Sequence, residues 1–495
     1  MHTDEAVHAR KLGTLIEDGI YEYNPEEYHG PTIYYFSLPF VWLSGARTYA
    51  EIPNEVPLRI APVVFGVGLI LLLLLMRDGL GRGAMVCAAV LTAVSPAMVF
   101  YSRYYIQEIL LVFFTFAAMG AAWRYTRTKR LWWALLSGAC VGLMYASKET
   151  FVVACIAMFA GAGLAAAWTR HVDHDELRLR DYIDRRHAAG AIVVAAIVGV
   201  LCLSVFMTQP RAIWDSVLSY GQYVQRAGTG DSSTSGAGLH NHPWYYYLKM
   251  LAFFKYAPGP WWSEALIMLL ALVGIGAVLK RKPAMEGNVR LLRLLAFYTI
   301  LMTFVYSIAP YKTPWCMLSF LHGMILMAGV GAVALYRLLP GKPLKAILSV
   351  LLVVGVWHLG AQAYRGNDVF DSDPRNPYVY AQTSRTFLRL PKRAEQIADV
   401  HPDGRDMLIK IIVPGSDYWP LPWYLRRFTS VGYWNEPPDD PDAAMIVTAP
   451  ALEADLDAAL SDRYEKEYVG LRPDVLLLTY VRADLWEEFI ERMEQ

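Results

Sequence analysis

About ten long apolar stretches recur along this 495-residue chain, and they constrain its fold more than any other feature. A membrane core about 30 Å thick is crossed by a helix of about 20 mostly apolar residues. The predicted spans lie near residues 57–76, 84–102, 108–123, 131–147, 151–168, 188–207, 264–279, 291–309, 316–336 and 345–363. Their number and spacing predict a polytopic α-helical membrane protein.

Composition supports a chain that is only partly embedded. It is 55% hydrophobic and 18% charged, too apolar for a soluble protein of this length and too polar for one that is membrane throughout. The formal net charge is zero, which gives no indication of nucleic-acid binding. All five cysteines fall in apolar runs and are interpreted as small core residues rather than disulfides or a metal cluster: Cys87, Cys140, Cys155, Cys202 and Cys316.

The basic residues predict the orientation of the spans. Alternate loops carry most of them, namely Arg77 and Arg82, then Arg124, Arg127, Lys129 and Arg130, then Arg170, Arg178, Arg180, Arg185 and Arg186, then Lys280, Arg281, Lys282 and Arg290, and finally Arg337, Lys342 and Lys345. The intervening connections hold few. Because basic loops stay in the cytoplasm, residues 1–56, the 208–262 loop and the tail after 364 are predicted to lie outside.

The start of the chain does not explain how residues 1–56 would reach the outer side. No signal peptide or apolar span precedes Asp4. Either the first downstream span inserts with its N-terminus outside, or an upstream helix is missing from this sequence. We favour the second, because His2-Thr3-Asp4-Glu5 looks like the middle of a motif.

Two helices are predicted within residues 1–56. Apolar residues at helical spacing over 7–16 indicate one helix, which Gly19 could end. The aromatic-rich segment 33–43, interrupted by Pro39, is too short to span comfortably. We interpret it as an interfacial helix with its rings at headgroup level.

Several charges map to the outer ends of the spans. Arg103 and Glu108 bracket a short turn, Lys148 lies between the fourth and fifth spans, and Lys312 lies in a Pro-Tyr-Lys-Thr-Pro turn. Charges at membrane depth are costly and usually face a cavity or pair with one another. Singly, each could be a helix-end charge that reaches water. As a set on one side, they indicate a shared polar cavity.

The 208–262 loop offers two histidines, His240 and His242. Together with His29 or a carboxylate they could bind a divalent metal ion, although solvated loop histidines are common. The Gly-, Ser- and Thr-rich stretch 228–238 is either a mobile loop that orders over substrate or a plain connector.

Six short motifs, in order, carry a resemblance to a known family. They are Asp4-Glu5; Tyr28-His29-Gly30-Pro31; Ser102-Arg103 with Glu108; Gly142-Leu143 running to Lys148; His242-Pro243-Trp244 with Tyr247-Leu248; and Lys312-Thr313-Pro314. Over residues 1–330 the chain resembles GT-C fold membrane glycosyltransferases of the group with protein O-mannosyltransferases and aminoarabinose transferases. Within that group it looks most like the archaeal and bacterial flippase-associated membrane proteins.

The resemblance implies transfer of a sugar from a polyprenyl-phosphate donor to a glycan, lipid or protein acceptor at the outer face, with no nucleotide cofactor. Such chemistry needs a base on the acceptor hydroxyl and positive charge at the phosphate. The implied roles are Asp4 as base and Glu5 as its support or as a residue that orients a metal. Arg103, Lys148 and Lys312 are implied as phosphate or pyrophosphate contacts, and Tyr28 and Glu108 as further substrate contacts. His29 with His240 or His242 is implied to hold a Zn, Mg or Mn ion.

The sequence departs from the aminoarabinose transferases at two motifs. Gly30 stands where those enzymes carry a lysine, so one phosphate contact must come from elsewhere. Gln107-Glu108 replaces a Pro-Asp pairing.

The tail from about residue 364 is hydrophilic and rich in Asp and Pro, and it predicts a small extracytoplasmic α/β domain. Strands are expected over 407–413, 444–448 and 475–480, with helices over 392–400, 421–427, 451–460 and 483–493. The aromatic cluster 418–423 could bind a sugar or cap the cavity, or pack against the membrane domain. The predicted domains are 1–56, 57–363 and 364–495.

The residues alone leave three functions open. Glycosyl transfer accounts for the acidic pair and the outer charges. A flippase-associated or transport subunit for lipid-linked sugars would use the same cavity without needing Asp4, and would carry polar residues along whole spans. A structural subunit would tolerate neutral changes at Asp4, Arg103 and Lys148.

Overall fold

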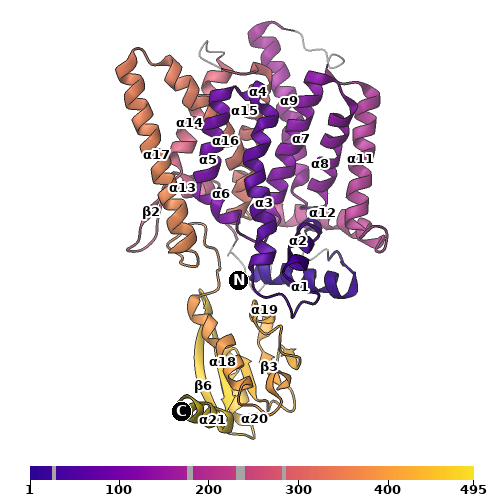
Figure 1. Ribbon diagram of the computed structural model, residues 1–495, viewed down its shortest axis with the longest axis vertical. Helices are drawn as coiled ribbons and strands as arrows, with labels where there is room; N and C mark the ends of the chain where they lie inside the picture. Colours follow the sequence, from indigo (N-terminus) through magenta and orange to yellow (C-terminus); the bar gives the residue numbers. More distant parts are fainter. Residues whose placement is uncertain (25–28, 176–181, 230–239, 281–285, 495) are drawn as a thin grey trace. The chain divides into compact units, whose positions relative to one another are not determined.

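A computed structural model describes residues 1–24, 29–175, 182–229, 240–280 and 286–494 (Figure 1). The chain divides into two compact units. One, here called the sheet unit, comprises Met1–Gly19, Val41–Glu55 and Val379–Gln495. The other, the helical unit, comprises Ile20–Phe40 and Val56–Tyr378. Contacts therefore divide the chain differently from composition, which grouped residues 1–56 as one segment.

Each of the ten predicted apolar stretches is helical in the helical unit. The helices are α2 (Thr32–Leu43), α3 (Val56–Leu72), α4 (Arg77–Leu80), α5 (Arg82–Val94), α6 (Pro96–Tyr101), α7 (Glu108–Thr128), α8 (Leu131–Tyr145), α9 (Phe151–Asp173), α11 (Arg185–Leu203), α12 (Arg211–Thr229), α13 (Tyr246–Ala252), α14 (Ala265–Leu279), α15 (Val289–Ile308), α16 (Leu318–Leu338) and α17 (Lys342–Asp368). Short 3₁₀ turns η1 (Leu73–Met76) and η2 (Pro314–Met317) extend α3 and precede α16.

Seven helical segments among the described residues are long and apolar enough to cross a membrane. They are Val56–Leu80, Glu108–Thr128, Phe151–Asp173, Arg185–Leu203, Val289–Ile308, Pro314–Leu338 and Lys342–Asp368. Three further predicted spans coincide with the shorter apolar helices α5, α8 and α14. The prediction of a polytopic helical membrane protein is confirmed, whereas the number of ten spans stays a prediction.

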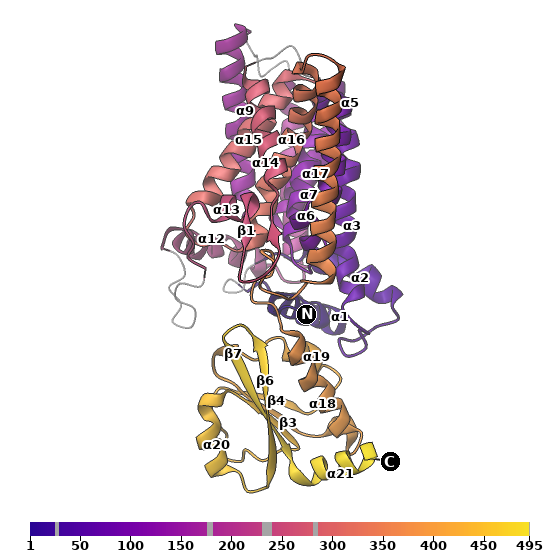
Figure 2. The ribbon, with the colours of Figure 1, turned by 90° about the vertical axis from the view of Figure 1, so that its left-hand side faces the viewer.

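Small residues bring the central helices into close contact. A Cβ added at Gly274 of α14 would lie 2.0 Å from the carbonyl oxygen of Met327 in α16, and one at Gly331 would lie 1.9 Å from that of Leu270. Only glycine allows backbones to approach this closely in a membrane bundle. The close contact places α14 against α16, whose residues are mostly buried (Figure 2).

The sheet unit is built on a five-stranded sheet in the order β4-β3-β5-β7-β6. Its strands are β3 (Ile409–Ile412), β4 (Val431–Trp434), β5 (Met445–Thr448), β6 (Tyr464–Arg472) and β7 (Val475–Arg482). β3 pairs in parallel with β4 and β5, and β7 pairs antiparallel with β5 and β6. The expected C-terminal α/β structure is confirmed.

Helices cover both faces of this sheet, as Figure 2 shows. They are α18 (Arg389–Ala398), α19 (Leu421–Tyr424), α20 (Glu453–Ala459) and α21 (Ala483–Glu494). On one face Ile409 and Ile411 join a large apolar core with α18 and α21. On the other, Ile412 and Ile446 pack with Leu456 of α20. The alternation follows from the two-residue period of a strand.

The first helix belongs to the same unit. Helix α1 (Thr3–Asp18) ends at Gly19, whose φ of 67° is left-handed, as predicted. Residues 41–55 are bonded to α19 and the residues that follow it: the Trp423 indole donates to Glu55 at 3.2 Å, and the Arg426 guanidinium donates to the Ile52 carbonyl at 2.6 Å. The N-terminal segment is therefore held by residues about 370 positions away.

Candidate functional site

A turn over residues 310–316 in the helical unit brings three predicted site residues together. The backbone N–H of Lys312 donates to the His240 carbonyl at 2.9 Å, and that of His242 donates to the Pro310 carbonyl at 3.1 Å. The Lys312 ammonium donates to the carbonyls of His242, at 3.2 Å, and Ala309. The histidine loop and the lysine turn, about 70 residues apart, form one structure.

Lys312 is fully buried, yet within the described ranges no carboxylate pairs with it. Its ammonium bonds to neutral carbonyl oxygens, and burial lowers the pKa of Lys312. A buried cation without a counter-ion gains from binding an anion. This position therefore suits a phosphate oxygen.

Glu108 and Lys148 form a buried ion pair between the start of α7 and the turn after α8. Their side chains are only 7% and 6% exposed, so neither charge reaches out to water. Cys316 and Tyr306 lie within electrostatic reach of both members of the pair. The pair therefore lies beside the lysine turn, with much of the Lys148 charge neutralised by Glu108.

His29 is fixed by three hydrogen bonds. Its N–H donates to Glu149 Oε1 at 2.7 Å, its Nδ1 lies 3.1 Å from Glu149 Oε2, and its carbonyl accepts from the Tyr21 hydroxyl at 2.6 Å. The Tyr23 hydroxyl also donates to Glu149, at 2.8 Å. Burial would raise the pKa of Glu149, but the hydrogen bonds and charge of His29 outweigh it and lower the pKa to about 2.

The backbone at His29 is strained, with a φ of 72°. Such conformations cost about 1–3 kcal/mol and persist where the surroundings enforce them. The next residue, Gly30, donates to the Ser147 carbonyl at 3.0 Å, and a Cβ there would lie 2.0 Å from the Ala146 carbonyl oxygen. The backbone at Ala146 leaves no room for a Cβ, so neither lysine nor any other residue with a side chain fits at position 30 without a backbone shift.

The predicted metal set is not assembled. Among the described residues, no three His, Cys, Asp or Glu side chains are grouped closely enough to hold an ion. His29 bonds through Nδ1 to Glu149, while the His240 ring packs on Tyr311 with centroids 4.7 Å apart. Within the described part of the chain, the predicted set of His29 with the loop histidines does not form a metal site.

His242 has a buried ring nitrogen that could form a further contact. Its ring stacks on Tyr246 at 4.1 Å, and its buried Nε2 has no hydrogen-bond partner among the residues the structure describes. Burial, with the nearby charges of His240 and Lys312, lowers the pKa of His242. The ring is therefore neutral at pH 7 and can offer one nitrogen.

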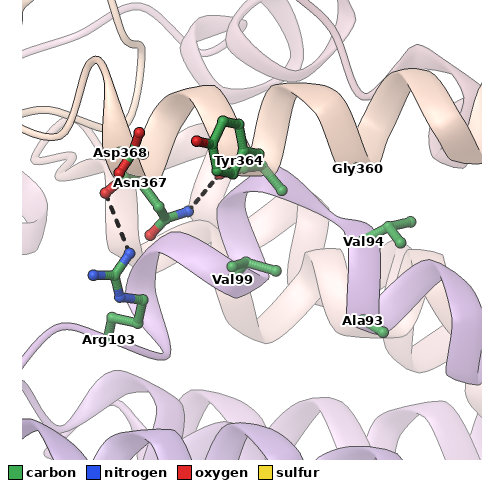
Figure 3. Close-up of a pocket in the computed structure, with 9 residues that line it drawn as sticks. Ala93, Val94, Val99, Arg103, Gly360, Tyr364, Asn367 and Asp368 are labelled. Carbon is green, nitrogen blue, oxygen red and sulfur yellow. Dashed lines mark hydrogen bonds between the residues drawn. The ribbon is translucent and has the colours of Figure 1, made fainter.

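Arg103 lies on the turn after α6 and faces α17. Its guanidinium donates to the Asn367 carbonyl at 3.2 Å and lines a cavity of about 360 Å³ (Figure 3). Neighbouring rings connect this turn to the lysine turn, because Tyr101 and Tyr104 both pack on Trp315. Tyr28 lies outside the described residues.

The acidic pair Asp4-Glu5 belongs to the sheet unit, where its two carboxylates differ. Glu5 is fully buried, and its Oε2 accepts from the His2 N–H at 3.0 Å. The His2 Nδ1 accepts from the Asp4 N–H at 3.1 Å, and its Nε2 lies 2.8 Å from the Tyr380 carbonyl oxygen. This is a capping box. Asp4 keeps a 43% exposed side chain, so of the two carboxylates it is the one that solvent reaches.

Sequence reasoning missed Glu264. This fully buried carboxylate, at the start of α14, accepts from the Ser95 hydroxyl at 2.5 Å, the Ala97 N–H at 3.0 Å and the Tyr378 hydroxyl at 2.7 Å. An acidic residue at the first position of an apolar span was the available signal. With three donors satisfied, Glu264 ties α6 to the 369–378 segment.

Comparison with known proteins gives one family match and several similar folds. Residues 33–213, which include Arg103, Glu108 and Lys148, match the family described as Dolichyl-phosphate-mannose-protein mannosyltransferase. The structure of ArnT from Cupriavidus metallidurans in the apo state aligns with 97% of this chain and 94% of its own, at 13% identity and a TM-score of 0.61. The same enzyme bound to undecaprenyl phosphate aligns over the same shares at 13% identity and a TM-score of 0.58.

The Archaeoglobus fulgidus oligosaccharyltransferase, in complex with Zn and sulfate, aligns with 98% of this chain and 72% of its own, at 12% identity and a TM-score of 0.54. The fold is that of the GT-C membrane glycosyltransferases. At these identities the likeness establishes the GT-C fold alone. None of the curated proteins matches the chain.

Proposed function

We propose that this protein is a membrane glycosyltransferase that moves a sugar from a polyprenyl-phosphate donor to an acceptor at the outer face of the membrane. The GT-C fold and the mannosyltransferase match support the reaction class. The observation that carries the proposal is the buried Lys312 ammonium, which bonds to two carbonyls and can take a phosphate oxygen.

The reaction needs a leaving group whose charge is stabilised. The acceptor hydroxyl oxygen attacks the anomeric carbon, the bond from that carbon to the phosphate oxygen breaks, and the polyprenyl phosphate leaves with the bonding electrons. Negative charge grows on the phosphate, and a fixed cation in a water-poor site stabilises it strongly. Lys312 is assigned this task, with Arg103 as a second cation.

The acceptor proton needs a base. Asp4 is assigned that role because its carboxylate is the exposed member of the acidic pair. Glu5 is assigned to holding the helix start through its bond to the His2 N–H. The proton moves from the acceptor oxygen to the Asp4 carboxylate as the new bond forms.

Lys148 and Glu108 are assigned a different task from Lys312. Their mutual pairing leaves little net charge, so we assign them to orienting the turn beside the lysine. His29, held by Glu149, and His242, with its unbonded Nε2, are assigned to polar contacts with the donor head.

The test is transfer of labelled hexose from a polyprenyl-phosphate hexose to cell-envelope acceptors by the purified full-length protein. Lys312→Gln is expected to lower kcat by about 10²–10³-fold, the usual cost of one lost charge-stabilising donor. Lys312→Arg keeps the charge and is expected to retain more activity. Lys249→Gln, an exposed lysine of the same region, is the matched control.

Equal loss in Lys312→Gln and Lys249→Gln, or no loss in either, would contradict the assignment of Lys312. No transfer by the folded wild-type protein, despite bound donor, would favour a transport or accessory subunit for lipid-linked sugars.

A further inference from the structure

Helix α12 and the turn before it expose a set of apolar side chains. Trp214 and Leu218 are 70% and 65% exposed, and Val217 is exposed as well. Their spacing of three and four residues puts them on one face of the helix. Phe206 and Met207, in the preceding turn, are also exposed. These five side chains are here called the apolar face of α12. Apolar residues gathered in this way mark an interaction surface.

The turn between α11 and α12 has an unusual backbone. Val205, Phe206 and Met207 have φ angles of 49°, 54° and 73°. Left-handed backbone is uncommon outside glycine and is least suited to a β-branched residue such as valine. Such conformations persist where the surroundings enforce them. Here the Phe206 N–H donates to the Leu201 carbonyl at 2.8 Å, and the Met207 N–H donates to Ser204 Oγ at 2.9 Å. The turn that exposes Phe206 and Met207 is therefore a bonded structure.

The opposite face of α12 is bonded to the candidate site. Ser219 is buried, and its Oγ lies 3.0 Å from the Tyr23 hydroxyl oxygen. The Tyr23 hydroxyl donates to Glu149 Oε1 at 2.8 Å, and Glu149 accepts from the His29 N–H. The Tyr220 hydroxyl donates to the Glu149 carbonyl at 3.5 Å. Helix α12 therefore reaches the contact between Glu149 and His29 through its Ser219 side.

Bilayer lipid is the partner that fits the apolar face of α12. Helix α11 is long and apolar enough to cross a membrane and is mostly exposed, and the turn with Phe206 continues its lipid-facing surface. The Phe206 ring also lies 5.8 Å from that of Tyr35 in α2, the predicted interfacial helix. Figure 1 shows α12 at the same end of the bundle as α2.

The composition of α12 favours a position at the bilayer surface over one across the bilayer. It is not among the seven described segments that are long and apolar enough to span. Arg211, at its start, is exposed and lies 3.8 Å from Asp215, so charge is present close to the apolar face. A helix with tryptophan and leucine on one face and polar side chains on the other lies in the membrane interface.

We propose that α12 binds the bilayer surface through its apolar face and thereby holds the Glu149–His29 contact in place from its other face. Lipid contact fixes the position of the helix, and Ser219 then keeps Tyr23 against Glu149. Ser219 is a positioning residue, because it acts on His29 through two other side chains. The proposal goes beyond the proposed function, since neither the lipid contact nor the His29 contact depends on sugar transfer.

The lipid contact is tested on the full-length protein in nanodiscs of phosphatidylethanolamine and phosphatidylglycerol. The probe is a phosphatidylcholine with a diazirine in its acyl chain, and mass spectrometry maps the adducts after illumination. Residues 206–218 are expected to be labelled at least about fivefold more than Met493, an exposed apolar residue of the sheet unit. Trp214→Ser is expected to lower this labelling. Trp357→Ser, at a residue 71% exposed on α17, is the matched control and should leave it unchanged.

The positioning role is tested by the rate at which diethylpyrocarbonate modifies His29 in the same nanodiscs. Trp214→Ser and Ser219→Ala are each expected to raise this rate about fivefold, the factor that corresponds to one lost hydrogen bond. Trp357→Ser should leave the rate unchanged. His401 of the sheet unit serves as an internal reference, because general loosening of the protein would raise its rate too.

Several results would overturn the proposal. Labelling of residues 206–218 no stronger than that of Met493 would show that lipid does not cover the apolar face and would indicate a protein partner instead. An unchanged rate at His29 in Trp214→Ser, or an equal rise at His401, would show that α12 does not position His29. Neither readout uses sugar transfer, so these results leave the proposed function to its own assay.

Discussion

Two pairs of adjacent polar residues, Asp4-Glu5 in the sheet unit and Lys148-Glu149 in the helical unit, look alike in sequence but divide their tasks differently. In both, the glutamate is buried and fixes a backbone: Glu5 bonds to the His2 N–H, and Glu149 to the His29 N–H. The first members differ. Asp4 stays 43% exposed, whereas Lys148 is buried against Glu108.

The difference teaches how an adjacent pair can serve both structure and chemistry. A side chain that is buried and fully bonded holds its segment, and its neighbour is then presented in a defined place. By this criterion the Asp4 carboxylate is accessible, whereas the Lys148 ammonium is occupied by its pair with Glu108. The following changes test that division, from the largest expected effect to the smallest.

Separate substitutions of Asp4 and Glu5 are expected to give the largest difference in transfer activity. Asp4→Asn removes the base while keeping the size of the side chain, and transfer is expected to fall by about 10²–10⁴-fold, the range for a general base. Glu5→Gln keeps an oxygen that can accept from the His2 N–H, so transfer is expected to stay within a few-fold of wild type. Labelled-sugar transfer, with helix content monitored by circular dichroism, measures both. Similar losses in the two variants would show that Asp4 is no more catalytic than Glu5.

Breaking the buried ion pair should affect stability more than chemistry. Lys148→Met leaves the Glu108 carboxylate buried without its partner, and the expected destabilisation is about 3–5 kcal/mol. The double variant Lys148→Met with Glu108→Leu removes both charges and is expected to recover most of the loss. Thermal unfolding in detergent compares the three proteins. If the double variant is no more stable than Lys148→Met, the pair does not act as a unit.

Much of the fold could be predicted, because helix position follows from apolar runs. The expected spans near 57–76 and 345–363 both coincide with helices. Strand β6, with the sequence Tyr-Glu-Lys-Glu-Tyr, was missed because it is an edge strand with solvated charges, and β4 was missed because it is four residues long with a glycine. Edge strands lack the continuous hydrophobic run that marks a buried strand.

The site was harder to predict than the fold, because its contacts join distant residues. Motif resemblance singled out His242 and Lys312, but the bond between them crosses 70 positions. The Lys148 charge looked available until Glu108, 40 positions earlier, proved to neutralise it. The periodicity of the sequence assigns a residue to a helix or strand. Which side chains pair with one another depends on how those helices and strands pack.

Weakening the contact between Glu149 and His29 is expected to lower stability by an intermediate amount. Glu149→Gln replaces one carboxylate oxygen with an NH₂ group that faces His29, and loss of a buried charge-assisted bond costs about 1–3 kcal/mol. The melting temperature is expected to fall, and transfer with it, because His29 then leaves its strained conformation. Glu22→Gln, an exposed glutamate close by in sequence, is the control and should leave both unchanged. An unchanged melting temperature in Glu149→Gln would show that the contact does not hold His29.

The smallest effect concerns the cap of α1 and depends on pH. His2 accepts from the Asp4 N–H through Nδ1, which requires a neutral ring, and burial lowers the pKa of His2 although the Asp4 and Glu5 carboxylates oppose the shift. Because the unfolded ring binds protons more tightly, the stabilisation is complete above the unfolded pKa of about 6.5 and is lost as pH falls below it. A lost cap costs about 1 kcal/mol.

Hydrogen exchange of the first amides of α1, corrected for intrinsic rates, measures this loss between pH 7.5 and 5.5. His2→Ser supplies a cap that does not titrate, so its protection is expected to change less with pH than that of the wild type. Equal pH dependence in the two proteins would place the titrating group elsewhere. If only the wild type loses protection, the segment that carries Asp4 is held in place by the neutral form of His2, and its order then depends on the pH of its compartment.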